Sequence, residues 1–442
     1  MQSRENWGSR FGFVMAAAGS AVGLGNIWKF PYVTGENGGG AFLILYLAFI
    51  LIFGLSLVIA EMAIGRMTQK NPVGAFRTLA GGAWPLIGYL GVATGFIILS
   101  FYIVIAGWTV AYMVFMLSGH LASTDSAQIA EVFTGYIGNG AWSVTTAVLF
   151  MLACCAVVVG GIGRGIERAS RLLMPTLFVM LLILVVRAVT LEGAGEGLAF
   201  YLKPDFSKVT GATFTAAIGQ AFFSLSLGMG ALITYGSYLS RSERLPGAAF
   251  MVVGLDTLVA VLAGFMILPA VFAYALDPAA GPGLTFITLP VVFAQMPAGT
   301  LFGFVFFALL FVAALTSAVS LLEVVVAYLV DEKQLSRARA VTWSAMICLA
   351  LGIPSALSQG AVDSLVFGGQ SFLDWAAQLT DILLPLGGLL TALFVGWVMG
   401  PRLVREITND GDVAFPLAGV WLFVCRFIAP LGIAWVLIAG LI

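Results

Sequence analysis

The sequence predicts an all-α protein that crosses a membrane many times, with about eleven transmembrane helices. Of its 442 residues, 61% are hydrophobic and only 9% are charged, whereas about 25% of the residues in soluble domains are charged. Apolar stretches of the roughly 20 residues that a membrane span requires recur along the whole chain. This composition excludes a soluble enzyme, a nucleic-acid-binding protein and a disordered chain, and a net charge of −1 does not indicate a polyanionic partner.

Eleven apolar stretches, separated by short polar segments, are the candidate spans. Several are longer than a bilayer requires, which predicts that these helices are tilted or protrude from the membrane. The four cysteines lie inside apolar stretches, where we expect buried thiols rather than disulfides. In order, the predicted spans cover residues 10–31, 39–66, 86–118, 142–160, 167–190, 213–240, 247–276, 300–330, 339–356, 370–398 and 415–441.

The distribution of basic residues predicts the orientation of these spans. Most of the 20 Lys and Arg residues precede the first span or lie in loops that follow even-numbered spans. Lys29, Arg187, Lys203 and Lys208 lie on the other side, and Arg426 lies within the last span. Because cytoplasmic loops carry the excess of basic residues, we expect a cytoplasmic N-terminus and, after eleven crossings, a C-terminus outside the cell.

Two of the spans contain a glycine-rich polar break near mid-membrane. The first span contains GSAVGLGN (19–26), and the sixth contains SLSLGMG (224–230). Each glycine lowers helix propensity by about 1 kcal/mol, and hydrocarbon does not satisfy the backbone groups that unwinding exposes. Freed carbonyls suit a hard cation, and the N-terminus of a half-helix suits an anionic group. Close packing of glycine-rich helices is the alternative explanation for either break alone.

The two breaks lie five spans apart, so spans 1 and 6 run in opposite directions. This spacing predicts two inverted repeats of five helices, covering about residues 10–190 and 213–398, within a single transmembrane unit of residues 1–442. The stretch 415–441 is then an additional helix. Matched breaks in two inverted halves are typical of the binding site of a secondary transporter.

Four motifs, in matching order, connect the chain to a known family. They are GSAVGLGNIWKFP followed by GENGGGAF, GIGRGIERASRLLMP, IGQAFFSLSLGMGALITYGSYL, and LTSAVSLL followed by LVDEKQLSRARAV. From about residue 4 to residue 398 the chain resembles the neurotransmitter:sodium symporter family, and within it bacterial transporters of hydrophobic amino acids.

The resemblance implies a transporter of the cell inner membrane rather than an enzyme. Its cargo would be neutral hydrophobic L-amino acids, imported with two Na⁺ by alternating access. No nucleic acid partner is expected, and pairing of two copies as a homodimer stays open. A membrane sensor or a channel with the same fold is the alternative, although a channel needs a continuous polar lining that the isolated polar clusters do not provide.

The resemblance also implies two sodium sites made of oxygen ligands. One would use the carbonyls of Gly19, Val22 and Ala313 and the hydroxyls of Thr316 and Ser317; the other would use the Ala21 carbonyl with Asn26, Ser224 and Asp256. Back-bonding of the two hydroxyls to their own helix is the alternative for Thr316 and Ser317.

Asp256 departs from the family pattern, because many members have a neutral asparagine there. A buried carboxylate in a span is expensive and indicates function. Many members also have a chloride-coordinating hydroxyl about one turn later, where this chain has Ala260. We therefore interpret Asp256 as a sodium ligand whose fixed charge replaces chloride.

The implied substrate pocket lies between the two breaks. Gly23 leaves space for a substrate that carries its own carboxylate, to which Tyr102 would donate a hydrogen bond, while apolar side chains would select hydrophobic substrates. The implied pocket residues are Ala21, Gly23, Leu24, Gly25, Ile98, Tyr102, Phe223, Ser224, Ser226, Met229, Ser317 and Leu321.

Two gates follow from the same resemblance. Lys29 and Asp374 resemble the outer gate pair, with Phe223 as the lid below them. The inner gate would consist of Arg4, Trp7, Ser237, Tyr238 and Asp331.

Other ionisable residues in the spans are Glu61, Glu323 and Asp381. Glu61 is expected to brace the N–H groups of the first break. Glu323, where the family often has glutamine, is a candidate for proton counter-transport, and Asp381 receives no role. The single histidine, His120, lies in a polar loop and is expected to be solvated.

Overall fold

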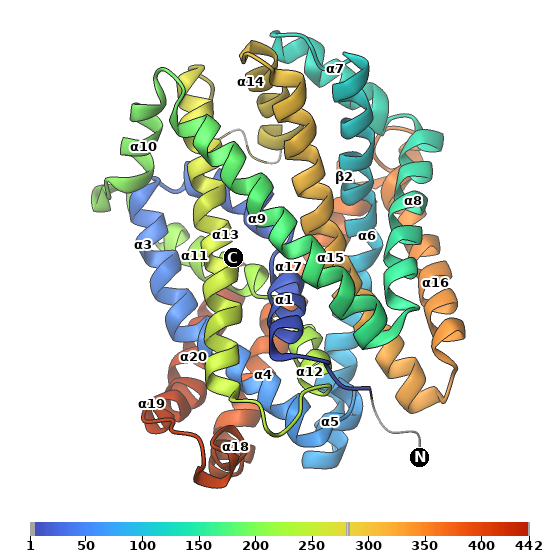
Figure 1. Ribbon diagram of the computed structural model, residues 1–442, viewed down its shortest axis with the longest axis vertical. Coiled ribbons are helices and arrows are strands. Elements are labelled where there is room, and N and C mark those ends of the chain that lie inside the picture. Colours follow the sequence, from blue (N-terminus) through green and yellow to red (C-terminus); the bar gives the residue numbers. More distant parts are fainter. Residues whose placement is uncertain (1–4, 280, 282, 441–442) are drawn as a thin grey trace.

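The computed structural model describes residues 5–440 except 280 and 282, and these residues are almost entirely helical (Figure 1). The N-terminal segment lies at one end of the helix array together with the short helices α5 (Pro72–Leu79) and α18 (Gly400–Ile407), which we call the N-terminal face. The helices α7 (Ser126–Ile137), α10 (Ala194–Leu202) and α14 (Leu289–Gln295) lie at the other end, the opposite face.

The first repeat contains five spans, two of them interrupted by a π-helical turn or a break. Span 1 consists of α1 (Arg10–Ala21), the π-helical turn η1 (Gly25–Lys29) and α2 (Phe30–Glu36). The remaining spans of this half are α3–η2–α4 (Gly40–Phe49, Ile50–Gly54, Leu55–Thr68), α6 (Pro85–Ser118), α8 (Gly140–Val158) and η3–α9 (Ile162–Glu167, Arg168–Val189).

The second half repeats this order and adds a final span. Span 6 is split into α11 (Gly211–Ser224) and α12 (Ala231–Gly236). It is followed by α13 (Leu245–Ala273), α15 (Gly299–Lys333), α16 (Arg337–Leu357), α17–η7–α18 (Phe372–Leu393, Phe394–Met399, Gly400–Ile407) and α19–η9–α20 (Ala418–Phe423, Val424–Ile428, Ala429–Ala439). Short elements connect the spans: η4 (Phe206–Lys208), η5 (Leu284–Thr288), η6 (Asp363–Leu365), η8 (Asn409–Gly411) and the antiparallel pair β1 (Val366–Phe367) and β2 (Gln370–Ser371).

The predicted fold class is confirmed, and one or more helices lie at each of the eleven predicted spans. Among the described residues, nine helices are long and apolar enough to cross a membrane, the bent pair that forms span 1 makes a tenth, and the split span 6 completes the set. The spans extend beyond the predicted bounds chiefly in span 1, which continues to Glu36, and in span 10, which continues to Ile407. All four cysteines are free thiols, as expected.

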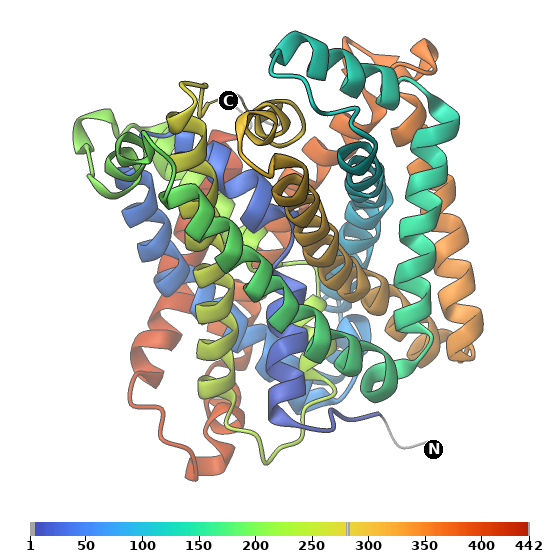
Figure 2. The same ribbon diagram turned by 45° about the horizontal axis from the view of Figure 1, so that its top comes forward.

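The broken span 1 lies in the interior of the array. Its first half, α1, packs between α9, α13 and α15 (Figures 1 and 2). Ten of the twelve α1 side chains are buried, mostly small alanine and glycine residues that allow neighbouring helices to approach closely. The fold therefore places the first break at the centre of the molecule, where other helices can satisfy its backbone groups.

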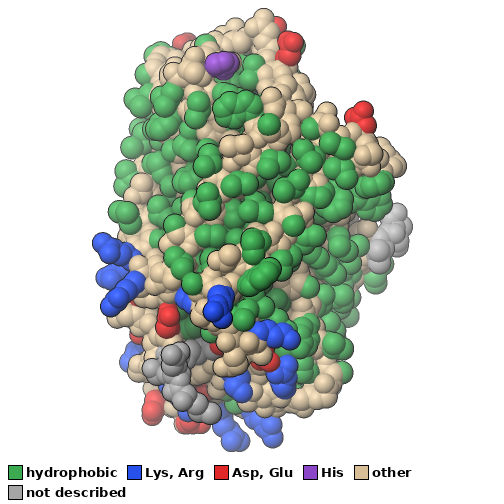
Figure 3. Space-filling model, turned by 90° about the vertical axis from the view of Figure 1, so that its right-hand side faces the viewer, with side chains coloured by type: hydrophobic (Ala, Val, Ile, Leu, Met, Phe, Trp, Pro, Cys, Tyr) green, Lys and Arg blue, Asp and Glu red, His purple; other side chains and the backbone are tan. Residues whose placement is uncertain are grey.

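Two groups of helices, which we call the two bodies, pack among themselves: α6, α8, α15 and α16 form one, and α1, α4, α12 and α13 form the other. The two bodies touch where α1 and α12 pack against α15, and α9 packs against both. Hydrophobic side chains cover most of the face drawn in Figure 3, and Lys and Arg side chains gather toward its lower end, which is the N-terminal face.

Candidate functional site

Both predicted breaks are present. In span 1, α1 ends at Ala21, and the axis of the helix that resumes at Gly25 is turned by 53°. In a continuous helix the Gly23 N–H would donate to the Gly19 carbonyl, but here it donates to Asn26 Oδ1 over 3.1 Å. In span 6 the backbone leaves the helix after Ser224 and passes through left-handed conformations at residues 226, 228 and 230.

The second break meets span 1 and span 7 at a buried polar cluster. Asn26 Nδ2 donates to Asp256 Oδ1 over 2.7 Å and to Ser224 Oγ over 2.9 Å. Ser224 Oγ donates to Asp256 Oδ2 over 2.7 Å, and Tyr46 Oη donates to Ser224 Oγ over 3.2 Å. The structure thus brings together Asn26, Ser224 and Asp256, the side chains predicted for one sodium site, and adds Tyr46, which sequence reasoning missed.

Two residues predicted for the other sodium site, Gly19 and Thr316, also lie close together. A Cβ added to Gly19 in α1 would lie 3.1 Å from Thr316 Cβ in α15. Thr316 Oγ1 donates to the carbonyls of Val312 and Ala313, each over 3.1 Å, so the back-bonding alternative describes its present hydrogen bonds. A hydroxyl that donates keeps lone pairs with which to bind a cation. The roles of Gly19, Val22, Ala313, Thr316 and Ser317 as sodium ligands stay predictions.

Tyr102 and Ser317, both predicted for the substrate pocket, lie close to the first break. A Cβ added to Gly23 would lie 2.9 Å from Tyr102 Oη and 3.1 Å from Ser317 Oγ. The Leu24 N–H donates to Tyr102 Oη over 3.1 Å, so this hydroxyl already faces the unwound backbone. Any side chain at residue 23 would therefore occupy the space between the break, Tyr102 and Ser317.

Apolar side chains surround this polar centre. A Cβ added to Gly95 in α6 would lie 3.6 Å from Leu321 Cδ2 and 4.0 Å from Met229 Cβ, which places these two side chains together. A Cβ added to Gly25 would lie only 2.7 Å from two ring carbons of Phe223. Ile98, Met229 and Leu321 are buried.

Ser226 has a contact that the sequence did not predict. Its hydroxyl donates to the Ser20 carbonyl over 3.1 Å, which ties the break in span 6 to the end of α1. Ala21 and Ser224 are buried beside the same two breaks. Contact of Ala21, Ser224 and Ser226 with substrate stays a prediction.

In this structure Lys29 is paired with Asp381 and not with Asp374, its predicted partner in the outer gate. Lys29 Nζ lies 4.0 Å from Asp381 Oδ1 and 4.5 Å from the centre of the Phe223 ring. Asp374 instead closes a capping box at the start of α17, where its Oδ2 accepts from the Ser371 N–H over 3.1 Å and from Ser371 Oγ over 2.7 Å. Asp374 and Asp381 lie about two helical turns apart in α17. Asp374 caps the start of this helix, and Asp381 is the acid near Lys29.

Lys29 also lines a cavity beside the Phe223 ring. The cavity has a volume of about 290 Å³, and Gln220, Phe223 and Asp381 are among its lining residues. Gln220 Nε2 donates to the Gly25 carbonyl over 2.9 Å, which satisfies part of the first break, and its Oε1 is buried with no hydrogen-bond partner among the described residues. A glutamine in the middle of an apolar span was the signal that sequence reasoning missed.

On the N-terminal face, Trp7 connects the N-terminal segment to span 6. Trp7 Nε1 donates to the Tyr235 carbonyl over 3.0 Å, and its backbone N–H donates to the Tyr238 carbonyl over 3.2 Å. Ser237 Oγ donates to the Thr234 carbonyl. Arg4, which completes the predicted inner gate, lies outside the described residues.

Asp331, a residue of the predicted inner gate, also contacts the start of α5. Its Oδ2 accepts hydrogen bonds from the backbone N–H of Asn71 over 3.0 Å and from Asn71 Nδ2 over 3.1 Å. Asn71 in turn caps α5 through the N–H groups of Val73 and Gly74. Asp331 thus fixes the start of α5 against α15.

Glu61 differs from expectation, and the role of Glu323 in proton counter-transport stays a prediction. Glu61 Oε1 accepts from the Gly228 N–H over 2.8 Å, so Glu61 braces the break in span 6 and not the break in span 1. The left-handed backbone at Gly228 turns this N–H toward α4, which explains the difference. Glu323 is buried and pairs with Arg337 Nη2 over 2.5 Å while accepting from Tyr238 Oη over 2.7 Å. This pairing compensates its charge within the protein.

Comparison with known proteins identifies the family. The model of the sodium:neurotransmitter symporter family matches residues 4–132 and 126–442. An uncharacterized sodium-dependent transporter of Bacillus subtilis, YhdH, is 40% identical over 98% of this chain and 96% of its own length. A second uncharacterized sodium-dependent transporter, from Haemophilus influenzae, is 37% identical over 100% of this chain and 99% of its own length.

A solved structure extends the similarity to the arrangement of the helices. The crystal structure of MhsT in complex with L-phenylalanine superposes with a TM-score of 0.91 and 47% sequence identity, and the match covers 99% of this chain and 100% of that one. The family match and these relatives extend over nearly the whole chain and include both breaks. The chain therefore belongs to the sodium:neurotransmitter symporter family, and it is a transporter rather than an enzyme.

Proposed function

We propose that this protein imports neutral hydrophobic L-amino acids together with two Na⁺ by alternating access, without a requirement for chloride. The observation that carries the proposal is that Gly23 brings no side chain to the first break, where Tyr102 and Ser317 approach so closely that an added Cβ would lie 2.9 Å from Tyr102 Oη. A substrate carboxylate that enters beside Gly23 when these two side chains move apart has the Tyr102 hydroxyl as a donor and lies near the polar cluster around Asn26 and Asp256. A glycine at this position suits a substrate that carries its own negative charge.

The apolar residues around this space support a hydrophobic side chain as the variable part of the substrate. Met229 and Leu321 meet beside Gly95, and the Phe223 ring covers the pocket from the side of Lys29. Methionine adapts its shape easily, which favours tolerance of several aliphatic and aromatic substrates. The likeness to MhsT, whose structure holds L-phenylalanine, supports the same class of substrate.

Asp256 supports the absence of a chloride requirement. Two sodium ions and a zwitterionic substrate leave excess positive charge in a low-dielectric site, where an uncompensated ion costs several kcal/mol. Asp256 is fully buried and sits at the polar cluster, so its fixed negative charge can compensate one ion. Ala260, one turn later in α13, offers no hydroxyl to hold an anion.

The sodium gradient supplies enough free energy for accumulation. A tenfold gradient contributes about 1.4 kcal/mol per ion, and a membrane potential of 100 mV contributes about 2.3 kcal/mol per charge. Two ions therefore contribute about 7 kcal/mol, which corresponds to roughly 10⁵-fold accumulation of a zwitterion.

We also propose that the N-terminal face is cytoplasmic, in the cell inner membrane. The basic side chains gathered toward this end support this orientation (Figure 3). With eleven crossings, the chain then ends outside the cell.

Uptake into proteoliposomes tests the proposal. Labelled L-phenylalanine should accumulate above its equilibrium level when a sodium gradient is imposed, and each of the twenty amino acids is added as a competitor. We expect competition by aliphatic and aromatic amino acids and unchanged uptake when gluconate replaces chloride. A channel or a sensor would give no accumulation against a gradient, and this result would overturn the proposal.

A further inference from the structure

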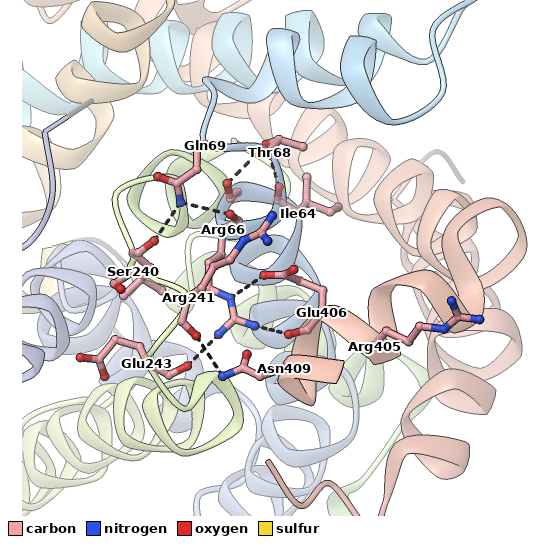
Figure 4. Close-up of polar contacts among 12 residues, drawn as sticks. Ile64, Arg66, Thr68, Gln69, Ser240, Arg241, Glu243, Arg405, Glu406 and Asn409 are labelled. Atoms are coloured by element: carbon pink, nitrogen blue, oxygen red, sulfur yellow. Dashed lines mark hydrogen bonds and ion pairs between the residues drawn. The ribbon is translucent and has the colours of Figure 1, made fainter. Parts of the chain in front are cut away.

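Arg66, at the end of α4 on the N-terminal face, is fully buried, with 0% of its side chain exposed (Figure 4). Arginine is rarely buried unless its charge and its donors find partners. Arg66 Nε donates to Glu406 Oε1 over 2.7 Å, Nη2 donates to the Glu406 carbonyl, and Nη1 donates to the Glu243 carbonyl over 2.7 Å. One guanidinium thus joins α4 to α18 and to the linker between α12 and α13.

Neighbouring contacts strengthen this junction. Gln69 Nε2 donates to the Leu239 carbonyl over 2.8 Å and to the Arg66 carbonyl over 3.1 Å, which ties α4 a second time to the segment after α12. Asn409 Nδ2, just after α18, donates to the Arg241 carbonyl over 2.9 Å (Figure 4). The geometry of a planar fork with three occupied donors is specific, and lysine cannot reproduce it.

Span 10 is divided between the two packed bodies. Its outer helix α17 packs chiefly against α6, which belongs to the body of α6, α8, α15 and α16, and against α20, with a smaller contact to α4. Its inner helix α18 packs against α4, which belongs to the other body. Between the two halves, Gly400 has φ 37° and ψ −117°, a conformation that L side chains rarely adopt, and it follows the π-helical turn η7.

We propose that Arg66 is a positioning residue that fastens α18 to the body of α4, α12 and α13, so that the inner end of span 10 moves with this body during transport while span 10 bends near Gly400. The inference rests on the proposed alternating access, in which one group of helices rocks against another around a central site. The two halves of span 10 then belong to different moving parts of the transporter.

Distances between spin labels test this assignment. Labels are attached to cysteines introduced at Arg405 in α18, Ser242 in the α12–α13 linker and Lys333 at the end of α15, all of which are exposed. Cys155, the one native cysteine that is not buried, is replaced by alanine. Distances are measured without sodium and with sodium plus L-phenylalanine. We expect the 405–242 distance to stay the same and the 405–333 distance to change.

Removing the guanidinium should release α18. In Arg66→Gln we expect the 405–242 distance distribution to broaden and to depend on sodium and substrate. We also expect the kcat of uptake to fall about tenfold with KM unchanged, because binding at the central site does not involve α18. Arg402→Gln, which removes a positive charge from an exposed position of the same helix, is the matched control and should behave as the wild type.

Each outcome decides a different point. If the 405–333 distance changes and the 405–242 distance changes equally in the wild type, the fastening is wrong while the proposed transport stands. If neither distance changes although uptake is measured, the rocking motion fails and the inference fails with it.

If Arg66→Gln keeps a fixed 405–242 distance and normal kcat, Arg66 has no positioning role. If this variant does not fold, Arg66→Lys replaces it, and an unchanged 405–242 distribution in that variant overturns the proposal.

Discussion

Replacing Asp256 with asparagine should remove most of the sodium affinity while leaving the fold intact. Asp256 accepts hydrogen bonds from Asn26 and Ser224, each over 2.7 Å. Asparagine has the same shape and keeps one of its two oxygens as an acceptor. Loss of a hydrogen bond to a charged group costs about 1.5–3 kcal/mol, but the variant no longer buries a charge, which offsets part of this loss. We therefore expect a change in Tm of only a few degrees.

The effect on sodium should be much larger than the effect on folding. A unit charge about 4 Å from a cation contributes roughly 4 kcal/mol at the effective dielectric constant of about 20 that suits protein sites. Since each 1.4 kcal/mol is a factor of ten, the sodium concentration for half-maximal binding of labelled L-phenylalanine should rise by about 10²- to 10³-fold.

The assay is sodium-dependent binding to purified protein, with thermal unfolding measured on the same samples. Asp412→Asn, an exposed acid far along the chain in the loop before α19, is the control and should leave the sodium dependence unchanged. A wild-type sodium dependence in Asp256→Asn would refute the assignment of Asp256 as a sodium ligand. Collapse of wild-type uptake in gluconate would refute its role as a replacement for chloride.

Three further changes probe other parts of the site. Thr316→Ala combined with Ser317→Ala should abolish sodium-dependent uptake while the protein still inserts and purifies; wild-type uptake would remove the sodium site at α15. Gly23→Asp should reduce uptake of neutral amino acids at least 100-fold, because the added carboxylate fills the space for the substrate carboxylate and repels it, and an unchanged KM would place the pocket elsewhere. Lys29→Gln and Asp381→Asn should each speed release of bound substrate by no more than about tenfold, since an exposed ion pair contributes about 0–1 kcal/mol. If Lys29→Gln has the same effect on release in the wild type and in Asp381→Asn, the two residues are not coupled.

The fold was predictable because its signals are local. Apolar length alone located the eleven spans, and glycine-rich composition located both breaks, at residues 19–26 and 224–230. The residues that meet at the breaks followed from a family pattern, and Asn26, Ser224 and Asp256 lie together as that pattern implies.

What the sequence did not reveal depends on which turn of a helix faces which neighbour. Asp374 and Asp381 lie on the same helix, and only the packing of α17 shows that Asp381 is the one near Lys29. Glu61 was assigned to the wrong break for the same reason. Gln220 escaped notice because its partner is a backbone carbonyl 195 residues away, and Arg66 escaped notice because a basic residue next to a loop is usually a topological signal.

Asn26 links the shape of the first break to the polar cluster at which we propose that sodium binds. Its oxygen accepts from the Gly23 N–H, while its nitrogen donates to Asp256 and Ser224. An amide oxygen has two lone pairs, so the Asn26 oxygen can bind a cation while it still accepts from the Gly23 N–H and fixes the backbone of the first break. If the ion and the amino acid bind on either side of this backbone, any change that one makes in the affinity of the other is returned by the same factor.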